Sequence, residues 1–351
     1  MSGDGVIVVG AGPVGLVTAY GLARAGVPVT VLEAEQQVID SPRAMVYHWA
    51  LHEDLHRLGL LEEVERRGFR KDDYGYRVHA TGEMVTYNLD RLAGETPFPY
   101  NVHLGQDELC ALVLERLAEL PHASSTVRRL LGLEFEGMTW DTRFVATNVY
   151  FDFHAHGYTR SVFLMDDVHG AVIAKINDEN LWRVTYAEAL SLPEETIGER
   201  IDDHFAEILP GGGPYELERF AGYRLHQRSV KRMRIGRALL AGDAAHATNP
   251  TGGFGLTGGL FDAFALIDTL GAAVVDGADP AALDGWAAQR RRIFIEVASP
   301  AATRMKHTVY DSDRPTAERT CAELRQMIED PVGFRDRLTF PIRLRSSRVP
   351  V

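Results

Sequence analysis

The chain has 351 residues, of which 45% are hydrophobic and 25% charged, as is typical of a globular protein with a substantial core. Its formal net charge is -12 at pH 7, so it has no surplus of lysine and arginine to neutralise phosphates. This balance argues against nucleic acid and anionic membranes as partners and favours small-molecule chemistry.

The two cysteines, Cys110 and Cys321, lie far apart in stretches that read as helix. This spacing predicts neither a disulfide framework nor a metal site built from cysteine. The N-terminal residues lead straight into an apolar strand, and no stretch reaches the roughly 18 apolar residues of a membrane-spanning helix. We therefore expect a cytoplasmic protein, monomeric or homodimeric, with no membrane span and no bound metal.

The N-terminal segment alternates strand, helix and strand. Residues 5–9 form an apolar run, residues 13–24 have helical spacing, and residues 27–32 are rich in β-branched side chains. This order predicts a βαβ unit with a parallel sheet that is buried on both faces. The elements predicted next are a helix over residues 46–67, strands over 74–80 and 83–90, and a helix over 102–120.

Residues 144–186 change to short runs rich in aromatic and β-branched residues, which predict an antiparallel sheet distinct from the first layer. The four runs read FVATNVYFDF, SVFLM, GAVIAKI and LWRVTY. A helix over residues 193–209 is predicted to be capped by Ser191, with Glu194 three residues later. The remaining elements are a short strand over Ala238–Leu240, a long apolar helix over 255–275 and mostly helix from Pro280 onward.

A glycine loop joins the first strand to the first helix. Gly10, Gly12 and Gly15 form the pattern G-x-G-x-x-G, Pro13 opens the helix, and Glu33 ends the second strand. Gly10 permits a tight turn, Gly12 lets the backbone approach a pyrophosphate, and Gly15 lets the helix pack on the strand. The helix N-terminus offers amides to the phosphates, and Glu33 can accept hydrogen bonds from a ribose diol. We favour a dinucleotide site over a turn that serves packing alone, although this loop does not distinguish FAD from NAD.

A second glycine-rich stretch, RALLAGDAAHATNPTGGFGLTGGLFDAFAL, spans residues 237–266. Asp243 ends a short apolar strand, where it can accept hydrogen bonds from hydroxyl groups, and three glycines in the turn leave room for a flat ring beside the backbone. The following helix would point its amides at the pyrimidine edge of a flavin, where negative charge collects on reduction. The plain alternative for Asp243 is a cap between strand and turn. We favour FAD, because an enzyme that uses only a nicotinamide needs no such second site.

This stretch resembles the second FAD motif of the class A flavin monooxygenases, the aromatic hydroxylases typified by para-hydroxybenzoate hydroxylase. The resemblance implies that Asp243 binds the ribityl chain and the pyrophosphate, and that the turn at Pro250 lies against the isoalloxazine ring. The further cofactor contacts that it implies come from Gly253, Gly255, Leu256, Arg43 and Gln106. The plain alternatives are a solvated loop cation for Arg43 and an ordinary polar residue at a helix N-terminus for Gln106. Thr257 departs from the family, which usually has asparagine at that place.

The third motif of that family, an Asp-Gly pair followed by a stretch ending in Val-Arg, is incomplete here. Its tail is recognisable in ASSTVRR, residues 123–129, but Pro121 and His122 stand where Asp-Gly is expected. The helix over 102–120 runs almost directly into this tail, whereas a doubly wound sheet needs about thirty further residues for a strand and a returning connection. Either a segment of the protein is missing from this sequence, or the deletion is genuine and exposes the sheet edge beside the flavin.

The resemblance implies an FAD-dependent monooxygenase that hydroxylates an aromatic small molecule, phenolic or polyketide-like. NAD(P)H would reduce the FAD, O₂ would form a flavin hydroperoxide, and one oxygen atom would pass to the ring. No catalytic residue is assigned, and the candidates nearest the flavin are Pro250, Gly253, Tyr223 and His226. For Tyr223 or His226 taken singly, ordinary sheet packing is the favoured interpretation. His246 is expected to be structural, and His154 and His156, on one strand face, lack a third metal ligand.

Two other functions stay open at this point. A degenerate relative could bind flavin or an aromatic ligand without turnover, as the incomplete third motif would allow. An enzyme of the same fold could have another outcome, such as halogenation or oxidation, although no lysine motif of the halogenase kind is present.

The predicted fold class is α/β, with a Rossmann-like FAD-binding domain of the glutathione-reductase type interleaved with an antiparallel-sheet substrate domain. The FAD-binding domain is assigned residues 1–75, 101–130 and 222–300. The substrate domain is assigned residues 76–100 and 131–221, and a C-terminal helical tail residues 301–351.

Overall fold

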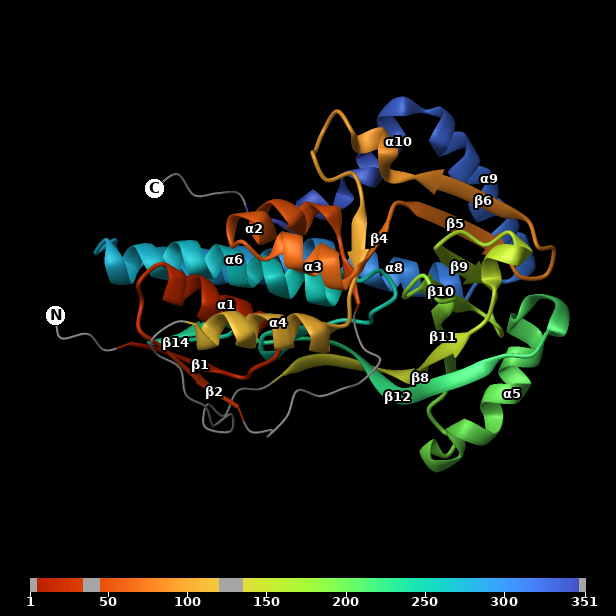
Figure 1. The fold of residues 1–351 in the computed structure, drawn as a ribbon, viewed down its shortest axis with the longest axis horizontal. Helices are drawn as coiled ribbons and strands as arrows, with labels where there is room; N and C mark the ends of the chain where they lie inside the picture. The colour runs from red at the N-terminus through yellow and green to blue at the C-terminus, as the bar shows by residue number, and fades with distance from the viewer. Residues whose placement is uncertain (1–4, 34–44, 120–134, 347–351) are drawn as a thin grey trace.

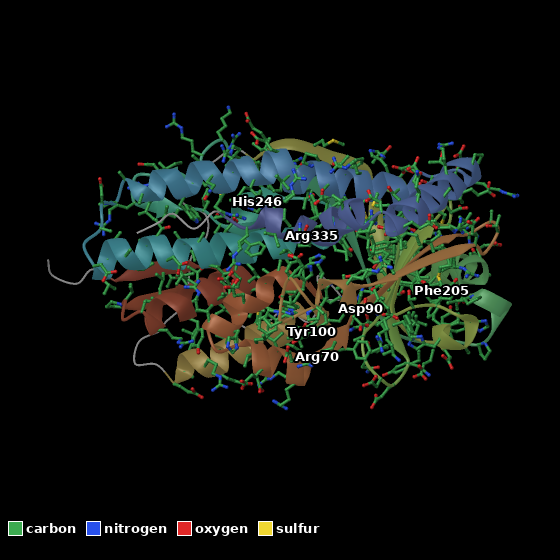
Figure 2. The ribbon with its side chains drawn as sticks, turned by 90° about the horizontal axis from the view of Figure 1, so that it is seen from above. Arg70, Asp90, Tyr100, Phe205, His246 and Arg335 are labelled. Atoms are coloured by element: carbon green, nitrogen blue, oxygen red, sulfur yellow. The ribbon has the colours of Figure 1, made fainter. Side chains whose placement is uncertain are left out.

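The computed structural model describes residues 5–33, 45–119 and 135–346 (Figure 1). The molecule is elongated, with a helical half around α1, α4 and α6 at one end and a large sheet at the other. Figure 2 gives the same division from above, with His246 among the helices and Phe205 toward the sheet end. The α/β fold class with C-terminal helices is confirmed.

The predicted βαβ unit is present. It consists of β1 (Val6–Val9), α1 (Pro13–Arg24) and β2 (Val29–Leu32), and the two strands pair in parallel. Within the described ranges no third strand joins this sheet. On β1 the side chains of Ile7 and Val9 are 63% and 47% exposed. Parallel sheets are normally covered on both faces, so the described residues leave one face of β1 uncovered.

Helix α1 lies beside α4 (Gln106–Ala118) and α6 (Phe254–Val275), and all three begin on the side that faces the large sheet (Figure 1). Glycines permit the close approach of α1 and α6. A Cβ atom on Gly21 would lie 2.3 Å from Ile267 Cδ1, and one on Gly259 would lie 2.7 Å from Val14 Cγ2 and 3.2 Å from Gly242 Cα. The packing of these two helices therefore brings the first glycine loop beside the turn at Gly242.

The helix predicted over residues 46–67 is wrong as a single element. The segment forms β3 (Val46–Tyr47), a 3₁₀ turn (Trp49–Leu51), α2 (His52–Arg57) and α3 (Leu61–Arg67). Gly59, with φ of +70°, ends the first helix in a left-handed conformation that favours glycine. The helix predicted over 102–120 likewise begins only at Gln106, because β7 (Asn101–His103) precedes it. Strand β7 pairs with β3 and with β4 (Phe69–Lys71) in a small antiparallel sheet.

The large sheet has eight strands in the order β15-β12-β8-β11-β10-β9-β5-β6. Their bounds are β5 (Asp73–Val78), β6 (Met84–Asn88), β8 (Glu136–Tyr150), β9 (Ser161–Met165), β10 (Ala171–Lys175), β11 (Leu181–Ala189), β12 (Glu216–Ser229) and β15 (His246–Ala247). The four predicted runs pair antiparallel, as expected. The sheet as a whole is mixed, because β5 joins β9 in parallel.

The two faces of this sheet serve different purposes. One face is covered by α5 (Ile197–Ile208), whose Ile201 and Phe205 pack in one core cluster with Val145 and Trp182 of the sheet. The other face lies on the side of the helical half.

The prediction that Ser191 caps a helix from residue 193 is wrong, since a 3₁₀ turn (Glu194–Thr196) comes first and α5 has no side-chain cap.

A hairpin of two short strands, β13 (Arg234–Ile235) and β14 (Ala238–Leu239), leads to a 3₁₀ turn at Gly242–Ala244. Strand β14 covers two of the three predicted residues. The C-terminal part is helical, as predicted, with α7 (Ala282–Ile293), a π-helical turn (Phe294–Ala298), α8 (Ser299–Tyr310), α9 (Arg314–Glu329), α10 (Pro331–Leu338) and a 3₁₀ turn (Phe340–Leu344).

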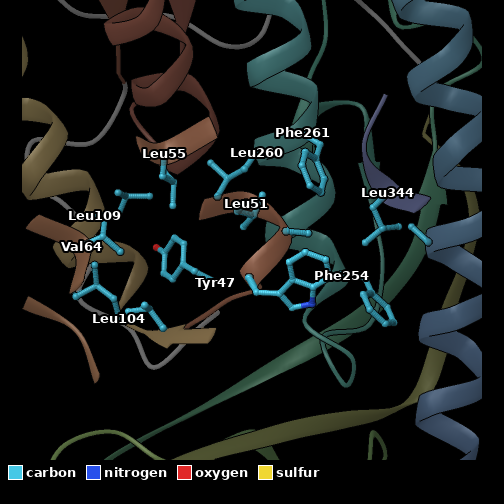
Figure 3. Packing of buried hydrophobic residues seen from close by; sticks show 14 of the residues in the cluster. Tyr47, Leu51, Leu55, Val64, Leu104, Leu109, Phe254, Leu260, Phe261 and Leu344 are labelled. Carbon is cyan, nitrogen blue, oxygen red and sulfur yellow. The ribbon is translucent and has the colours of Figure 1, made fainter. Parts of the chain in front are cut away.

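The main hydrophobic core joins α6 to the α2–α4 region, and Figure 3 shows Tyr47, Leu51 and Leu260 within it.

The prediction that no stretch matches a membrane-spanning helix is wrong, because the helix over Phe254–Asp276 has the length and the apolar composition of one. Of an 18-residue apolar window within this segment, 56% is buried inside the protein. The packing of α6 against α1 and α7 accounts for its apolar composition.

The close contact of α6 with α1 can be tested with two adjacent glycines of α6. Gly258→Ala meets open space and should raise the free energy of unfolding by about 0.5–1 kcal/mol, because alanine is the better helix former. Gly259→Ala places a Cβ against Val14 and Gly242 and should lower it by about 1–3 kcal/mol. Urea unfolding of the flavin-free protein measures both, and equal stabilisation by the two variants would contradict the packing described.

Candidate functional site

The first glycine loop has the geometry of a phosphate cradle. Gly10 has φ of +103°, and a Cβ on Gly15 would lie 2.0 Å from the Gly10 carbonyl oxygen, so both positions require glycine. Gly12 is the N-cap of α1 and has open space around it, and Pro13 is the first helical residue. Glu33 reaches back to the loop, where its Oε2 accepts a hydrogen bond of 2.5 Å from the Ala11 amide. A diphosphate can approach this backbone without meeting a side chain.

The second turn is held in place by the buried carboxylate of Asp262 on α6. Its Oδ2 accepts hydrogen bonds from the Gly242 amide at 2.9 Å and from His246 Nε2 at 2.8 Å, and its Oδ1 accepts one from Arg290 Nε at 2.6 Å. Burial raises the pKa of Asp262, but His246 and Arg290 outweigh it and hold the pKa at about 2. His246 is thus a structural residue here. The network presents Asp243, which is exposed, at the next position of the turn.

The segment from Pro250 to Gly253 leads into α6 through Gly253, which has φ of +69° and provides no side-chain cap. His48 supports this segment. Burial lowers the pKa of His48 to about 4, so the ring is neutral and its Nε2 donates to the Gly252 carbonyl at 3.1 Å. The ring also stacks on Phe254, with centroids 5.9 Å apart. Thr257, the departure from the family pattern, donates its hydroxyl hydrogen to the Gly253 carbonyl at 2.9 Å.

A strand of the large sheet also fixes this segment. Gln227 of β12 accepts a hydrogen bond from the Thr248 hydroxyl at 3.0 Å and donates one to the Ser299 hydroxyl at 2.7 Å. Sequence reasoning identified neither Gln227 nor His48. The only sequence signal for His48 is a polar residue in an apolar run, and Gln227 has none.

Helices α1, α4 and α6 share one feature at their N-termini. Each begins after a glycine, Gly12, Gly105 or Gly253, that gives no side-chain hydrogen bond to the first turn. Their free amides carry partial positive charge, and the three helix ends lie on the same side of the molecule (Figure 1). An extended ligand with a diphosphate and an electron-accepting ring suits this arrangement. The residues therefore fit FAD.

The structure brings most of the predicted cofactor residues to these helix ends. They are Gly10, Gly12, Pro13, Gly15, Glu33, Gln106, Asp243, Pro250, Gly253, Gly255 and Leu256. Arg43 and the ASSTVRR stretch lie outside the described residues. Tyr223 of β12 packs edge-on against Phe144, with centroids 6.1 Å apart, and His226 Nδ1 lies 3.0 Å from the Thr139 hydroxyl.

The placement of His154 and His156 on one strand is wrong, because both lie in a 3₁₀ turn (Phe153–His156). His154 Nδ1 lies 2.9 Å from the Tyr158 carbonyl, and His156 stacks on Phe151. The two side chains therefore make separate local contacts.

Buried basic side chains lie on the small sheet and on the neighbouring part of the large one. His103 of β7 has its Nδ1 atom 2.6 Å from the Lys175 carbonyl oxygen. The Lys71 ammonium lies 3.3 Å from the centre of the Tyr74 ring, and Arg183 Nε donates to Asn148 Oδ1 at 3.1 Å. Burial lowers the pKa of His103 well below its usual range, and the charges of Lys71 and Arg183 lower it further. We call Lys71 and Arg183, together with the neutral ring of His103, the cationic cluster.

Comparison with known proteins agrees with this site. A family model of the FAD binding domain matches residues 5–124 and 122–300. The chain is 42% identical to 6-hydroxy-3-succinoylpyridine 3-monooxygenase HspB of Pseudomonas putida, over 96% of this chain and 97% of the relative. It is 37% identical to a para-nitrophenol 4-monooxygenase of a Pseudomonas species, over 99% of this chain and 97% of the relative.

Solved structures show the same fold. The crystal structure of p-nitrophenol 4-monooxygenase PnpA from Pseudomonas putida matches with a TM-score of 0.93 at 36% identity and covers 99% of both chains. Aklavinone-11 hydroxylase, solved with FAD and aklavinone, matches with a TM-score of 0.74 at 24% identity, over 87% of this chain and 69% of that one.

The comparisons also bear on the incomplete third motif. The alignments with the two relatives extend over 380 and 392 positions, although this chain has 351 residues. The relatives therefore contain residues that have no counterpart here. The two matches to the family model meet at residues 122–124, which is where the sequence places the gap.

The role of Asp243 is tested by Asp243→Ala. Loss of charge-assisted hydrogen bonds to FAD, each worth about 1.5–3 kcal/mol, should weaken FAD binding at least about tenfold. Quenching of flavin fluorescence in a titration of the flavin-free protein measures the affinity. Asp276→Ala, at the opposite end of α6, is the control and should leave it unchanged, and full retention of FAD by Asp243→Ala would contradict the assignment.

Proposed function

The chain belongs to the FAD binding domain family and is an FAD-dependent aromatic monooxygenase, and from this premise we propose its substrate class and site of attack. The substrate is a phenol or hydroxypyridine that carries a substituent para to the ring hydroxyl. Oxygen enters at the carbon that bears this substituent.

The names of the two similar relatives support the position of attack. A para-nitrophenol 4-monooxygenase acts at carbon 4, which in para-nitrophenol carries the nitro group. A 6-hydroxy-3-succinoylpyridine 3-monooxygenase acts at carbon 3, which carries the succinoyl group and lies para to the 6-hydroxyl. The two substrates differ in ring and substituent but share this relation between hydroxyl and attacked carbon.

The cationic cluster is the observation that carries the proposal for this chain. Buried charges are normally paired with an opposite charge. Among the described residues no carboxylate lies within ion-pair distance of Lys71, and burial lowers the pKa of this lysine well below its usual range. A ring hydroxyl that ionises beside the cluster would supply the negative charge. Such an anion pushes electrons to its para carbon, where an electrophilic oxygen adds.

Bound FAD, reduced by NAD(P)H, supplies the oxygen transfer from O₂. The protein's own task is to bind FAD at Gly10–Gly15, Glu33, Gln106, Asp243 and Pro250–Leu256 and to hold the ring over the Pro250–Gly253 segment. The division into an FAD-binding domain and a substrate domain, a monomeric or homodimeric state and a cytoplasmic location belong to the same proposal.

Turnover of matched phenols tests the proposal. Para-nitrophenol should stimulate NADH or NADPH consumption and yield quinone, nitrite and water, with one oxygen atom of labelled O₂ at the para carbon. Para-nitroanisole, whose hydroxyl is methylated and cannot ionise, should give none of these products. Hydroxylation beside the hydroxyl, with the nitro group retained, would refute the proposed position of attack.

A further inference from the structure

His103 has an unused hydrogen-bond acceptor in the interior. The residue ends β7 and is 1% exposed. A carbonyl oxygen only accepts hydrogen bonds, so the contact with Lys175 places the ring proton on Nδ1. With its pKa held well below the usual range, the ring is neutral and Nε2 carries a lone pair. Nε2 is buried and has no hydrogen-bond partner among the described residues.

Three side chains on neighbouring elements lower the pKa of this ring: Lys71, Arg183 and the imidazole of His48. Lys71 lies on β4, directly beside β7, where it pairs with Asn101. Arg183 lies on β11 of the large sheet, and His48 follows β3 on the other side of β7. An unpaired buried acceptor costs about 1–3 kcal/mol, and a hydrogen bond from a ligand would remove this cost.

We propose that the Nε2 atom of His103 accepts the proton of the substrate's ring hydroxyl, and that Lys71 and Arg183 stabilise the phenolate. The O–H bond breaks, the N–H bond forms on Nε2, and the electron pair stays on the ring oxygen. The positive charges that lower the pKa of His103 also lower the pKa of a bound phenol. The proton therefore moves between two groups whose pKa values are both lowered. This inference rests on the proposed substrate class.

His103→Gln removes the proton acceptor with little change in size. For this variant kcat/KM should fall about 10²- to 10⁴-fold at pH values below the pKa of the free phenol, the usual contribution of a general base. The loss should shrink as pH rises, because the substrate then arrives already ionised. A structural role alone would lower activity equally at all pH values.

The colour of bound para-nitrophenol gives a second readout, because only the phenolate is yellow. The parent protein should bind the phenolate below the solution pKa, whereas His103→Gln should bind the colourless phenol. Lys71→Met should raise the pKa of the bound phenol. The control is His52→Gln, because His52 is fully buried and has a pKa lowered by burial to about 4.

An unchanged pH profile together with a yellow His103→Gln complex would overturn the role of His103. Failure of the proposed function looks different. In that case the parent protein consumes no NAD(P)H with any para-substituted phenol, while the colour of the bound ligand still reports whether His103 takes the proton.

A second, independent cluster lies where β5 ends. His79 follows β5, His169 lies in the turn between β9 and β10, and Glu207 lies on α5. One ligand atom from each lies within 4.8 Å of the others, and the two imidazole rings are 5.2 Å apart. His169 Nδ1 is buried and has no hydrogen-bond partner in the described part of the chain. His204, one turn before Glu207, has the same unpaired Nδ1.

The geometry points to a site for a divalent transition metal ion such as Zn²⁺, for which two imidazoles and one carboxylate are a suitable ligand set. Because the ligands come from three elements, the ion would fasten α5 to the end of the sheet. A tetrahedral ion would need the three atoms to close in slightly, which rotation of the exposed Glu207 side chain permits.

Competition for Zn²⁺ with a chelating dye tests this site. The protein should bind one equivalent and gain thermal stability, and His169→Ala or Glu207→Gln should each weaken binding at least about tenfold. His156→Ala, an exposed histidine outside the cluster, is the control and should bind as the parent does. Absence of stoichiometric binding, or binding that these two variants leave intact, would overturn the proposal.

Discussion

The arrangement of the flavin site depends on the buried carboxylate of Asp262. This one group joins α6 to the Gly242 amide, to His246 on β15 and to Arg290 on α7. Arg290 in turn donates hydrogen bonds to the carbonyls of Gly258 and Leu344, so the C-terminal segment is bound to the same network. Breaking a buried pair of this kind costs about 3–5 kcal/mol. The turn that presents Asp243 is therefore held in place by a buried charge network.

Residues that act through the backbone were predictable from the sequence, and residues that act through tertiary contacts were not. The loop of Gly10 and the turn before Asp243 need glycine at fixed spacing, and such spacing is visible in one dimension. His103 lies in a strand of three residues that apolar spacing merged with the helix after it, and its partners come from β4, β10 and β11. The antiparallel runs were predictable from their composition. Their membership in an eight-stranded mixed sheet was not, because β5 and β12 join from distant parts of the chain.

The incomplete third motif, at residues 121–129, concerns the strands beside the first glycine loop. The strand that begins the glycine loop exposes Ile7 and Val9, whereas parallel strands are normally buried on both faces. The relatives have additional residues, and the family match is interrupted at residues 122–124. His48, Gln227 and the Asp262 network hold the turns at Gly242 and at Gly252, and they lie in other segments of the chain. The gap therefore lies apart, in the sequence, from the contacts that hold these two turns.

The molecule as a whole carries a negative net charge, whereas the cationic cluster in its interior is positive. A net charge of -12 repels an approaching phenolate, although salt limits this field to about 8 Å under physiological conditions. The cationic cluster attracts the same anion once water is excluded, because charges interact far more strongly in the interior than in solvent. A substrate that enters as the neutral phenol avoids the repulsion and meets the attraction only after it ionises inside. An acceptor for its proton must then lie inside as well, and among the described residues of the cluster only His103 offers a buried, unpaired lone pair.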